Sequence, residues 1–288
     1  MKFLEKLTKI DRRIIFLLVA LAVIIPLVVP LSLPTKPSKY SKKLYDAVDK
    51  IPPNNQPVLI SADYSPSMMP ELHPMFKAII RHCFAKKIRV LIMTLDPTGA
   101  ALAEDALNEI SKEYTVEYGK DYVFLGFKAG YAAVMMAIGQ NIRQAYPVDA
   151  YGKPLDDFPM MAGIRNYADI PLVIDIAGSA VINSWVNYAG TRYHAQVGAG
   201  CTAVSTADYY PFLQAGQLVG LLNGMKGASE YEYLNWKNGY SKASRQASKG
   251  MDAVSIVHLM IMLFIILGNI GYLALRFKSS KKLEEHRR

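Results

Sequence analysis

Two apolar runs, one near each end of the chain, limit the possible folds more than any other feature of this sequence. Residues 14–34 and residues 253–275 contain no Asp, Glu, Lys or Arg. About 20 helical residues cross the roughly 30 Å of hydrocarbon in a bilayer, so each run is long enough for a transmembrane helix. Pro26 and Pro30 lie in the first run, and membrane helices tolerate proline because neighbouring groups satisfy the freed backbone. We therefore expect one span near each end.

The first apolar run is also compatible with a secretory signal peptide, which would be removed from the mature protein. Its apolar core is longer than the usual core of a signal peptide. No A-x-A-like cleavage site follows it. An uncleaved membrane anchor is therefore the expected form.

The basic residues next to the spans predict how the chain crosses the membrane. Residues 1–13 carry five Lys and Arg, residues 276–288 carry six, and seven flank the spans on the side of the intervening domain. Cytoplasmic segments carry the excess of Lys and Arg. Both tails are therefore predicted to be cytoplasmic, which places the domain in a periplasmic, extracellular or lumenal space.

The formal net charge of +9 belongs mostly to these two tails. Residues 1–13 contribute +3 and residues 276–288 contribute +4, which leaves +2 for the rest of the chain. Nucleic-acid binding requires a basic patch on the folded domain, so the charge distribution argues against it. The expected partner is the lipid bilayer, whose anionic head groups attract basic tails.

Short apolar segments alternate with helical patterns between the two spans, across residues 35–227. Continuous rather than alternating hydrophobicity is typical of strands that are buried on both faces of a parallel sheet. The alternation predicts an α/β, Rossmann-like three-layer domain with a mostly parallel sheet of about five strands. The strands are expected at 57–64, 89–95, 122–127, 172–177 and 197–204, and the helices at 39–50, 71–86, 99–112, 130–143, 162–167, 180–193 and 210–225. Residues 228–252 are polar and aromatic, which suits a stalk near the membrane interface.

Polar side chains follow the predicted strands at their carboxyl ends, where ligands bind in open parallel sheets. The same side chains are also preferred helix caps, which is the alternative explanation for each of them. Free backbone N–H groups at the helix N-termini would favour an anionic ligand group there. The predicted ligand-binding residues are Asp63, Ser65, Ser67, Asp96, Thr98, Ser179, Ser205 and Asp208.

Asp63, Ser65 and Ser67 form the most specific pattern in this set. A carboxylate and two hydroxyls at alternating positions are hard oxygen ligands that suit Mg²⁺ or Ca²⁺. The pattern resembles the D-x-S-x-S metal site of von Willebrand factor A domains. The segment 98–102 (TGAAL) resembles the T-G-x-A-L segment that carries that family's threonine ligand, and Asp175 corresponds to its later aspartate. The resemblance implies a divalent-metal-dependent adhesion site, although the family places its threonine further downstream.

Recognisable catalytic signatures are missing from the sequence. It contains no G-x-S-x-G, P-loop, H-E-x-x-H or C-x-x-C, which argues against the enzyme classes that these motifs define. The histidines of the soluble region are expected to serve helix packing or to lie at the surface. His258 and Asn269 lie inside the second apolar run, where either a structural or a functional role is open. Cys83 and Cys201 are expected to be buried free thiols rather than a disulfide.

Gly216, Gly220 and Gly224 recur every four residues in the predicted helix 210–225. Glycine costs a helix about 1 kcal/mol relative to alanine, so repeated glycine suggests close approach of another backbone. The partner is either the sheet or a second subunit, and these residues are predicted oligomer contacts.

Three functions remain open from the sequence. The first is a structural scaffold that forms a homo-oligomer, with two anchors fixing the orientation of the domain. The second is a ligand- or metal-binding domain that uses the carboxyl ends of the strands. The third is a membrane-tethered enzyme that uses the same cleft.

Overall fold

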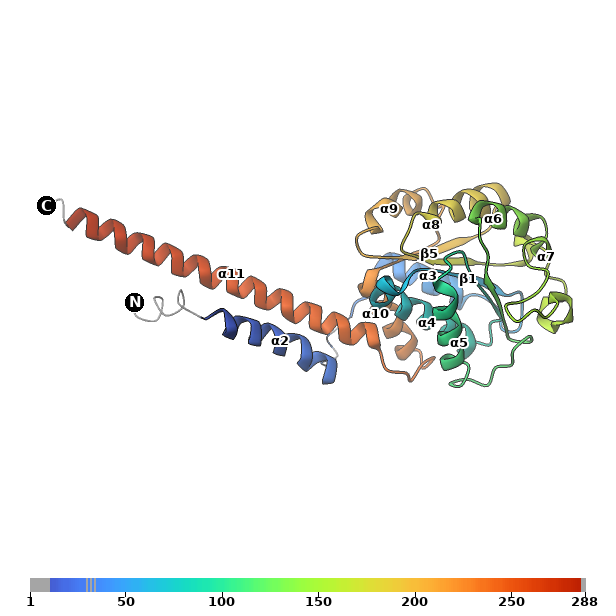
Figure 1. Cartoon of the computed structure of the whole chain (residues 1–288), viewed down its shortest axis with the longest axis horizontal. Coiled ribbons are helices and arrows are strands. Elements are labelled where there is room, and N and C mark those ends of the chain that lie inside the picture. Colours follow the sequence, from blue (N-terminus) through green and yellow to red (C-terminus); the bar gives the residue numbers. More distant parts are fainter. Residues whose placement is uncertain (1–10, 30, 32, 34, 286–288) are drawn as a thin grey trace. The chain divides into compact units, whose positions relative to one another are not determined.

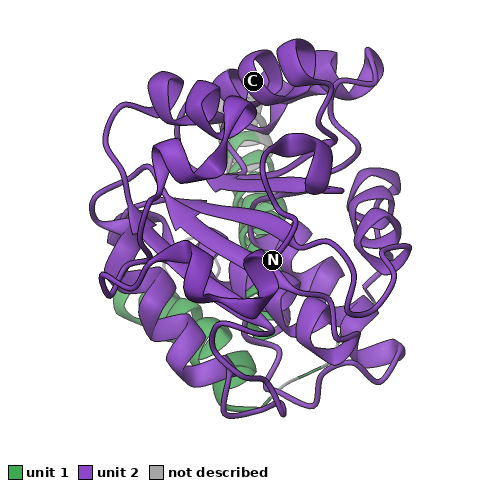
Figure 2. Cartoon of the chain, turned by 90° about the vertical axis from the view of Figure 1, so that its right-hand side faces the viewer, with its two compact units in different colours: residues 1–33, 249–288 green, residues 34–248 purple. Residues whose placement is uncertain are grey.

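The computed structural model describes residues 11–29, 31, 33 and 35–285, and the chain divides into two compact units (Figures 1 and 2). Residues 34–248 form one unit, an α/β domain. Residues 1–33 and 249–288 form the other unit, which contains the two terminal helices.

The domain is built around a six-stranded parallel sheet with the strand order β3-β2-β1-β4-β5-β6. This order is that of the doubly wound Rossmann fold, in which the chain starts in the centre and winds outward in both directions. The predicted α/β class is therefore confirmed, with six strands instead of about five. The strands are β1 (Val58–Asp63), β2 (Val90–Thr94), β3 (Tyr122–Phe127), β4 (Val173–Ala177), β5 (Val197–Cys201) and β6 (Leu221–Asn223).

Helices cover both faces of the sheet, which is visible as two layers in Figure 1. One layer contains α3 (Lys39–Asp49), α4 (Met69–Ala85), α5 (Gly99–Ile110) and α10 (Gly224–Lys237). The other contains α6 (Tyr131–Gln140), α7 (Ile142–Ala145), α8 (Val181–Ser184), the π-helical segment η5 (Trp185–Thr191) and α9 (Thr206–Gln214).

The two faces of the sheet carry two separate cores because successive strand residues point to opposite faces. In β1, Val58, Ile60 and Ala62 belong to the core under α4. Leu59 belongs to the other core, and by the same alternation Ser61 and Asp63 point to that side. Every residue of β1 is buried, including the polar Ser61 and Asp63.

The predicted helix 210–225 is wrong, and two elements replace it. Helix α9 ends at Gln214 and β6 follows at Leu221–Asn223, so the three glycines share no helical face. Gly216 has a φ of +74°, which is left-handed backbone in a turn. A Cβ on Gly220 would lie 2.7 Å from the carbonyl oxygen of Tyr40 in α3. The close approach that the glycines indicated is therefore, at Gly220, a contact within the domain.

Further differences from the sequence expectations concern local irregularities. The expected helix 130–143 breaks at Asn141, whose extended backbone and side-chain acceptor begin α7. The expected helix at 162–167 is instead a turn between two short 3₁₀ segments, η3 (Pro159–Met161) and η4 (Tyr167–Asp169), and a third, η2 (Leu155–Asp157), precedes them. The stalk expected at 228–252 also differs, because α10 packs on α4 and Tyr231 is fully buried in the domain core.

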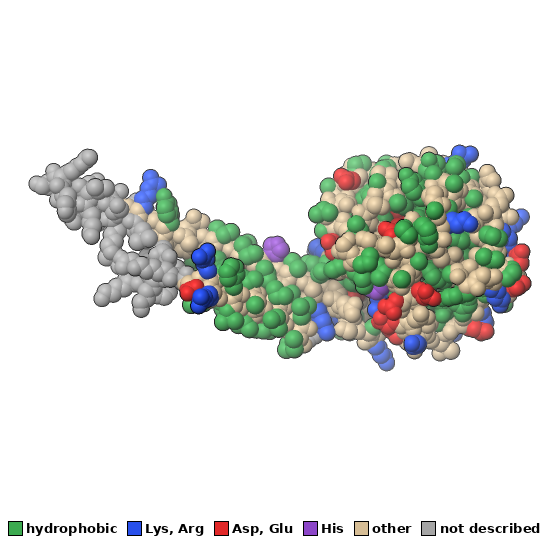
Figure 3. Space-filling model, in the orientation of Figure 1, with side chains coloured by type: hydrophobic (Ala, Val, Ile, Leu, Met, Phe, Trp, Pro, Cys, Tyr) green, Lys and Arg blue, Asp and Glu red, His purple; other side chains and the backbone are tan. Residues whose placement is uncertain are grey.

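The second unit contains α2 (Arg12–Val28) and the apolar part of α11 (Gln246–Glu285). Of the described residues, one helical stretch is long and apolar enough to cross a membrane, Gln246–Leu273. Helix α2 is shorter because Val29 is extended, as expected for a residue before proline. The part of the chain that the structure describes therefore contains no second helix of full membrane length. Figure 3 shows hydrophobic side chains along this unit.

Candidate functional site

The carboxyl ends of β1 and β4 define the main candidate site. The chain winds away from β1 toward β2 on one side and from β4 toward β5 on the other. In open α/β sheets this topological switch point is where ligands bind. The loops that diverge there begin at Tyr64 and Gly178, and the Gly178 N–H lies 3.4 Å from the carbonyl oxygen of Asp63.

Ser65 and Ser67 lie in the β1 loop, but their hydroxyls bond to each other at 2.8 Å. The Asp63 carboxylate points the other way, into the protein. It accepts hydrogen bonds from the Ser61 hydroxyl at 2.8 Å and the Leu95 N–H at 2.5 Å. The three predicted metal ligands therefore do not converge, and the described residues contain no group of three His, Cys, Asp or Glu side chains suited to a metal.

The remaining predicted ligand residues make local turn contacts. Asp96 accepts from both the N–H and the hydroxyl of Thr98, at 2.8 and 2.7 Å, just before α5. The Ser205 hydroxyl lies 3.1 Å from that of Thr202 before α9. These are bonds within the turns before the helices; neither Thr98 nor Ser205, the N-cap residues of α5 and α9, caps its helix with its side chain.

Ser179 and Asp208 also lie at the carboxyl edge, and both side chains are exposed. The Ser179 carbonyl accepts from the Tyr209 hydroxyl at 3.1 Å, which ties the β4 loop to α9. Of the eight predicted residues, only Asp63, Ser65, Ser67 and Ser179 lie in the loops of the switch point or directly before them.

A pair of buried carboxyl groups lies beneath the switch point. Asp175 is the sheet partner of Ser61, so its side chain shares a face with Ser61 and Asp63. Burial raises the pKa of Asp63, against the effect of its hydrogen bonds from Leu95 and Ser61. Burial and the neighbouring charge of Asp63 raise the pKa of Asp175 well above its usual range. The pair therefore resists holding two negative charges without a compensating positive one.

The sequence contains a pattern that indicates each of the two buried acids but not their pairing. A single Asp interrupts the apolar β4 segment LVIDIA, and Ser61 and Asp63 are two residues apart in β1. Buried acids are rare unless they are paired or bound. The sequence does not reveal that β4 lies next to β1, which is what joins the two acids.

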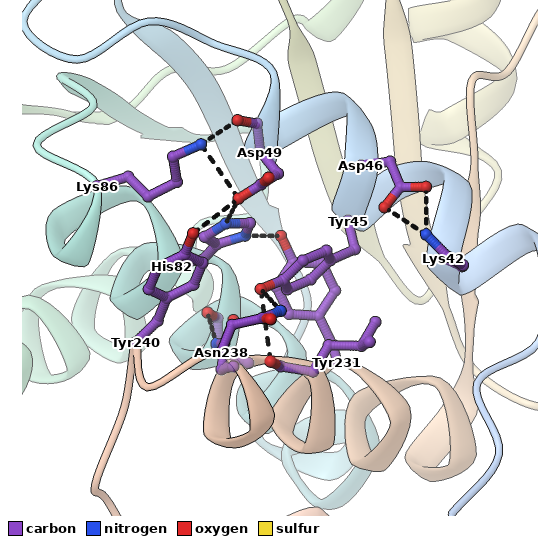
Figure 4. Close-up of polar contacts among 12 residues, drawn as sticks. Lys42, Tyr45, Asp46, Asp49, His82, Lys86, Tyr231, Asn238 and Tyr240 are labelled. Atoms are coloured by element: carbon purple, nitrogen blue, oxygen red, sulfur yellow. Dashed lines mark hydrogen bonds and ion pairs between the residues drawn. The ribbon is translucent and has the colours of Figure 1, made fainter.

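A second polar cluster surrounds His82 between α3, α4 and α10 (Figure 4). The His82 ring is fully buried and stacks between Tyr45 and Tyr240, with ring centroids 4.3 and 5.1 Å away. Its Nδ1 lies 2.9 Å from the Tyr231 hydroxyl and its Nε2 lies 3.2 Å from Asp49. Because the Tyr231 hydroxyl donates to Nδ1, the Nε2–H donates to the Asp49 carboxylate.

The environment of His82 favours its neutral form. Burial lowers its pKa to about 4, and the Asp49 carboxylate opposes this only in part. Asp49 also pairs with Lys86 at 3.1 Å and accepts from the Tyr240 hydroxyl at 3.1 Å. Both ring nitrogens have partners, so the cluster holds three helices together and offers no free group for catalysis.

An open groove of about 650 Å³ lies between α4, α5 and the segment after α10. Its charged walls neutralise one another. Lys77 pairs with Glu109 at 2.5 Å, and Arg81 pairs with Glu113 at 2.6 Å and with Glu109 at 3.1 Å. Four of the five charged residues that line the groove are therefore engaged in ion pairs, and the fifth is the exposed Lys242.

The other residues singled out from the sequence have structural partners. Cys83 and Cys201 are buried free thiols, as expected. In α11, the Nδ1–H of His258 donates to the Val254 carbonyl at 2.7 Å, and Asn269 donates to the Ile265 carbonyl at 2.9 Å. Bonds to the preceding turn satisfy these donors within the helix itself.

Comparison with known proteins adds no further information on the site. No protein family, curated protein or solved structure matches this chain.

Proposed function

We propose that this protein is a two-span membrane protein that displays a ligand-binding α/β domain outside the cytoplasm. Helix α2 has 17 residues, of which the first two are Arg12 and Arg13, and the uncharged run of the sequence continues beyond it to residue 34, which is long enough for a span. The less exposed residues of both terminal helices recur every three or four positions, which places them on one face of each helix. They are Ile15, Val19, Ala22 and Pro26 on α2 and Ile256, Met260, Phe264, Leu267 and Gly271 on α11.

These two faces support a membrane hairpin in which α2 and α11 pack against each other. Both helices belong to the same compact unit. The Leu33 N–H donates to the Asp252 carboxylate at 3.3 Å, which joins the chain after α2 to α11. A signal peptide that is cleaved from the mature protein would not need a helix face that packs against α11. The basic residues of both tails favour a cytoplasmic location for them.

The strand order β3-β2-β1-β4-β5-β6 is the observation that carries the binding proposal. It creates one switch point, between β1 and β4, and the loops that diverge there carry the exposed hydroxyls of Ser67 and Ser179. Met68 lies between these loops, where a Cβ on Gly178 would collide with its thioether. Methionine is flexible, so we expect it to move aside when a small polar ligand enters.

Native mass spectrometry of the full-length protein, purified in mild detergent, tests this function. We expect a mass above the 32.0 kDa of the chain alone, because the ligand is retained. The variant Ser179→Trp puts an indole at the mouth of the switch point and is expected to lose the extra mass. Ala207→Trp on α9, also an exposed position, serves as the matched control and is expected to keep it. An unliganded wild-type chain would contradict the proposal.

A homo-oligomeric scaffold is the second candidate, and it requires that the start of α11 be held in place. The Glu232 carboxylate in α10 accepts from the N–H groups of Ala247 and Ser248 in the first turn of α11, at 3.1 and 3.0 Å. A carboxylate at a helix N-terminus is stabilising, so this contact ties the start of α11 to the domain. The same mass spectrum decides this candidate, since a scaffold requires a particle of several chains and a monomer excludes it.

A further inference from the structure

The buried acid pair lies in a patch of small and polar side chains in the middle of the sheet. Asp175 pairs in register with Ser61 on one side and Ala199 on the other. Asp63 pairs in register with Ala177, the next residue of β4 on the same face. The strand neighbours of the two carboxyl groups are therefore small. The space beside the carboxyl groups is filled by side chains from the elements that cover this face of the sheet.

In the described part of the chain, neither of the two acids forms an ion pair with a positive side chain. Among the described residues, no Lys, Arg or His nitrogen lies within 4.0 Å of either carboxylate. Asp63 has hydrogen-bond donors in Ser61 and Leu95. Both oxygens of Asp175 are buried and accept no hydrogen bond from a donor among the described residues, and the group beside them is the Asp63 carboxyl. An uncompensated buried carboxylate is costly, so the molecule requires a positive charge or a proton there.

Two aromatic side chains with unsatisfied polar atoms cover the same place. The indole N–H of Trp185 and the hydroxyl of Tyr146 are buried, and neither makes a hydrogen bond of ordinary geometry with another described residue. Both lie near Asp63, because the Trp185 N–H lowers the pKa of Asp63, and the Asp63 charge raises that of Tyr146 after burial. Unsatisfied buried groups of this kind normally have a bound water or ion as their partner.

We propose that Asp63 and Asp175 bind a hard divalent cation, Mg²⁺ or Ca²⁺, inside the domain beneath the switch point. Two carboxylates balance its charge and supply the oxygen ligands that such ions prefer. The Ser61 hydroxyl is a further oxygen at the site, and waters on the ion would bond to the Trp185 N–H and the Tyr146 hydroxyl. This site goes beyond the proposed ligand site in the loops, and either one can exist without the other.

Trp185 provides a direct probe, because the chain has only one other tryptophan, the exposed Trp236. In a Trp236→Phe background, full-length protein in detergent is stripped with EDTA and titrated with Mg²⁺ or Ca²⁺. We expect a saturable change in Trp185 fluorescence. We also expect the melting temperature to rise by about 5 °C or more at a hundred-fold excess over Kd.

Asp175→Asn removes one ligand charge while keeping the shape of the side chain, and it is expected to abolish both responses. Asp105→Asn, at an exposed carboxylate of α5, is the matched control and is expected to keep them. Asp63→Asn provides a second test at the other ligand. Insensitivity of the wild-type protein to both ions, with fluorescence that changes only with pH, would mean that a shared proton replaces the cation and would overturn the proposal. A response that persists in Asp175→Asn would overturn it as well.

Discussion

Replacing Gly220 with alanine is expected to destabilise the domain by about 3 kcal/mol or more, a size typical of overpacking at a site that cannot relax. The added Cβ would lie 2.7 Å from both the Tyr40 carbonyl oxygen and the Leu44 Cβ. These atoms belong to α3, whose Leu44 is fully buried. Denaturant unfolding of the full-length protein, followed by tryptophan fluorescence, measures the loss.

Gly190→Ala is the matched control for this substitution. A Cβ at Gly190 would meet its nearest neighbour, a methyl group of Val197, at an ordinary distance of 3.6 Å, so we expect little change. The comparison also tests the oligomer contact predicted for Gly220. If Gly220 served a subunit contact alone, alanine there would change the mass of the particle and leave the stability of the domain intact.

Lowering the pH from 6.5 to 4 is expected to remove about 3 kcal/mol of stability through His82. Burial holds the pKa of His82 near 4 in the folded domain, whereas the ordinary value is 6.5. Between these values the unfolded chain binds a proton that the folded chain excludes. The stability that the neutral His82 contributes to the folded domain is therefore complete above about pH 6.5, and it is lost as the pH falls toward 4.

Unfolding free energies measured across this range isolate the effect when wild type is compared with His82→Gln. The variant is expected to lose stability at neutral pH and to show a weaker dependence on pH. Some dependence remains, because burial also lowers the pKa of His73 to about 4. His194→Asn, at an exposed position with left-handed backbone, is expected to keep the wild-type slope. Equal slopes in wild type and His82→Gln would contradict the described environment of His82.

The first four strands were predictable because burial on both faces leaves a continuous apolar segment. Observed β1 to β4 lie within one residue of the predicted ends at each terminus. Strand β6 was missed because three residues carry too little pattern, and the flanking glycines resembled a helical repeat. The segment after β6 was misjudged for a different reason. Its polar composition suggested a stalk, but α10 packs into the domain and buries Ser229, Glu230 and Asn235 together with its apolar side chains.

The position of the candidate site in the fold was predictable from the sequence, but the arrangement of its side chains was not. Sequence position put Asp63 at the end of a strand, and the strand's alternation put Ser61 on the same face. Whether Asp63 points toward the loops or toward the interior depends on the register with β4, a strand about 110 residues away in the chain. Pairing between such distant segments is set by tertiary packing, so the Asp63–Asp175 pair emerged only from the folded chain.

Labelling of single cysteines in intact cells tests the central claim, that two spans hold the domain outside the cytoplasm. The background is low because Cys83 and Cys201 are fully buried. Three variants suffice: Thr8→Cys and Ser279→Cys in the tails, and Ser67→Cys at an exposed position of the domain. With a membrane-impermeant maleimide, we predict that Ser67→Cys reacts in intact cells and that both tail variants react only after permeabilisation. Reaction of Thr8→Cys on the same side as Ser67→Cys would show that α2 does not span the membrane, and protection of Ser67→Cys in intact cells would contradict the external location of the domain.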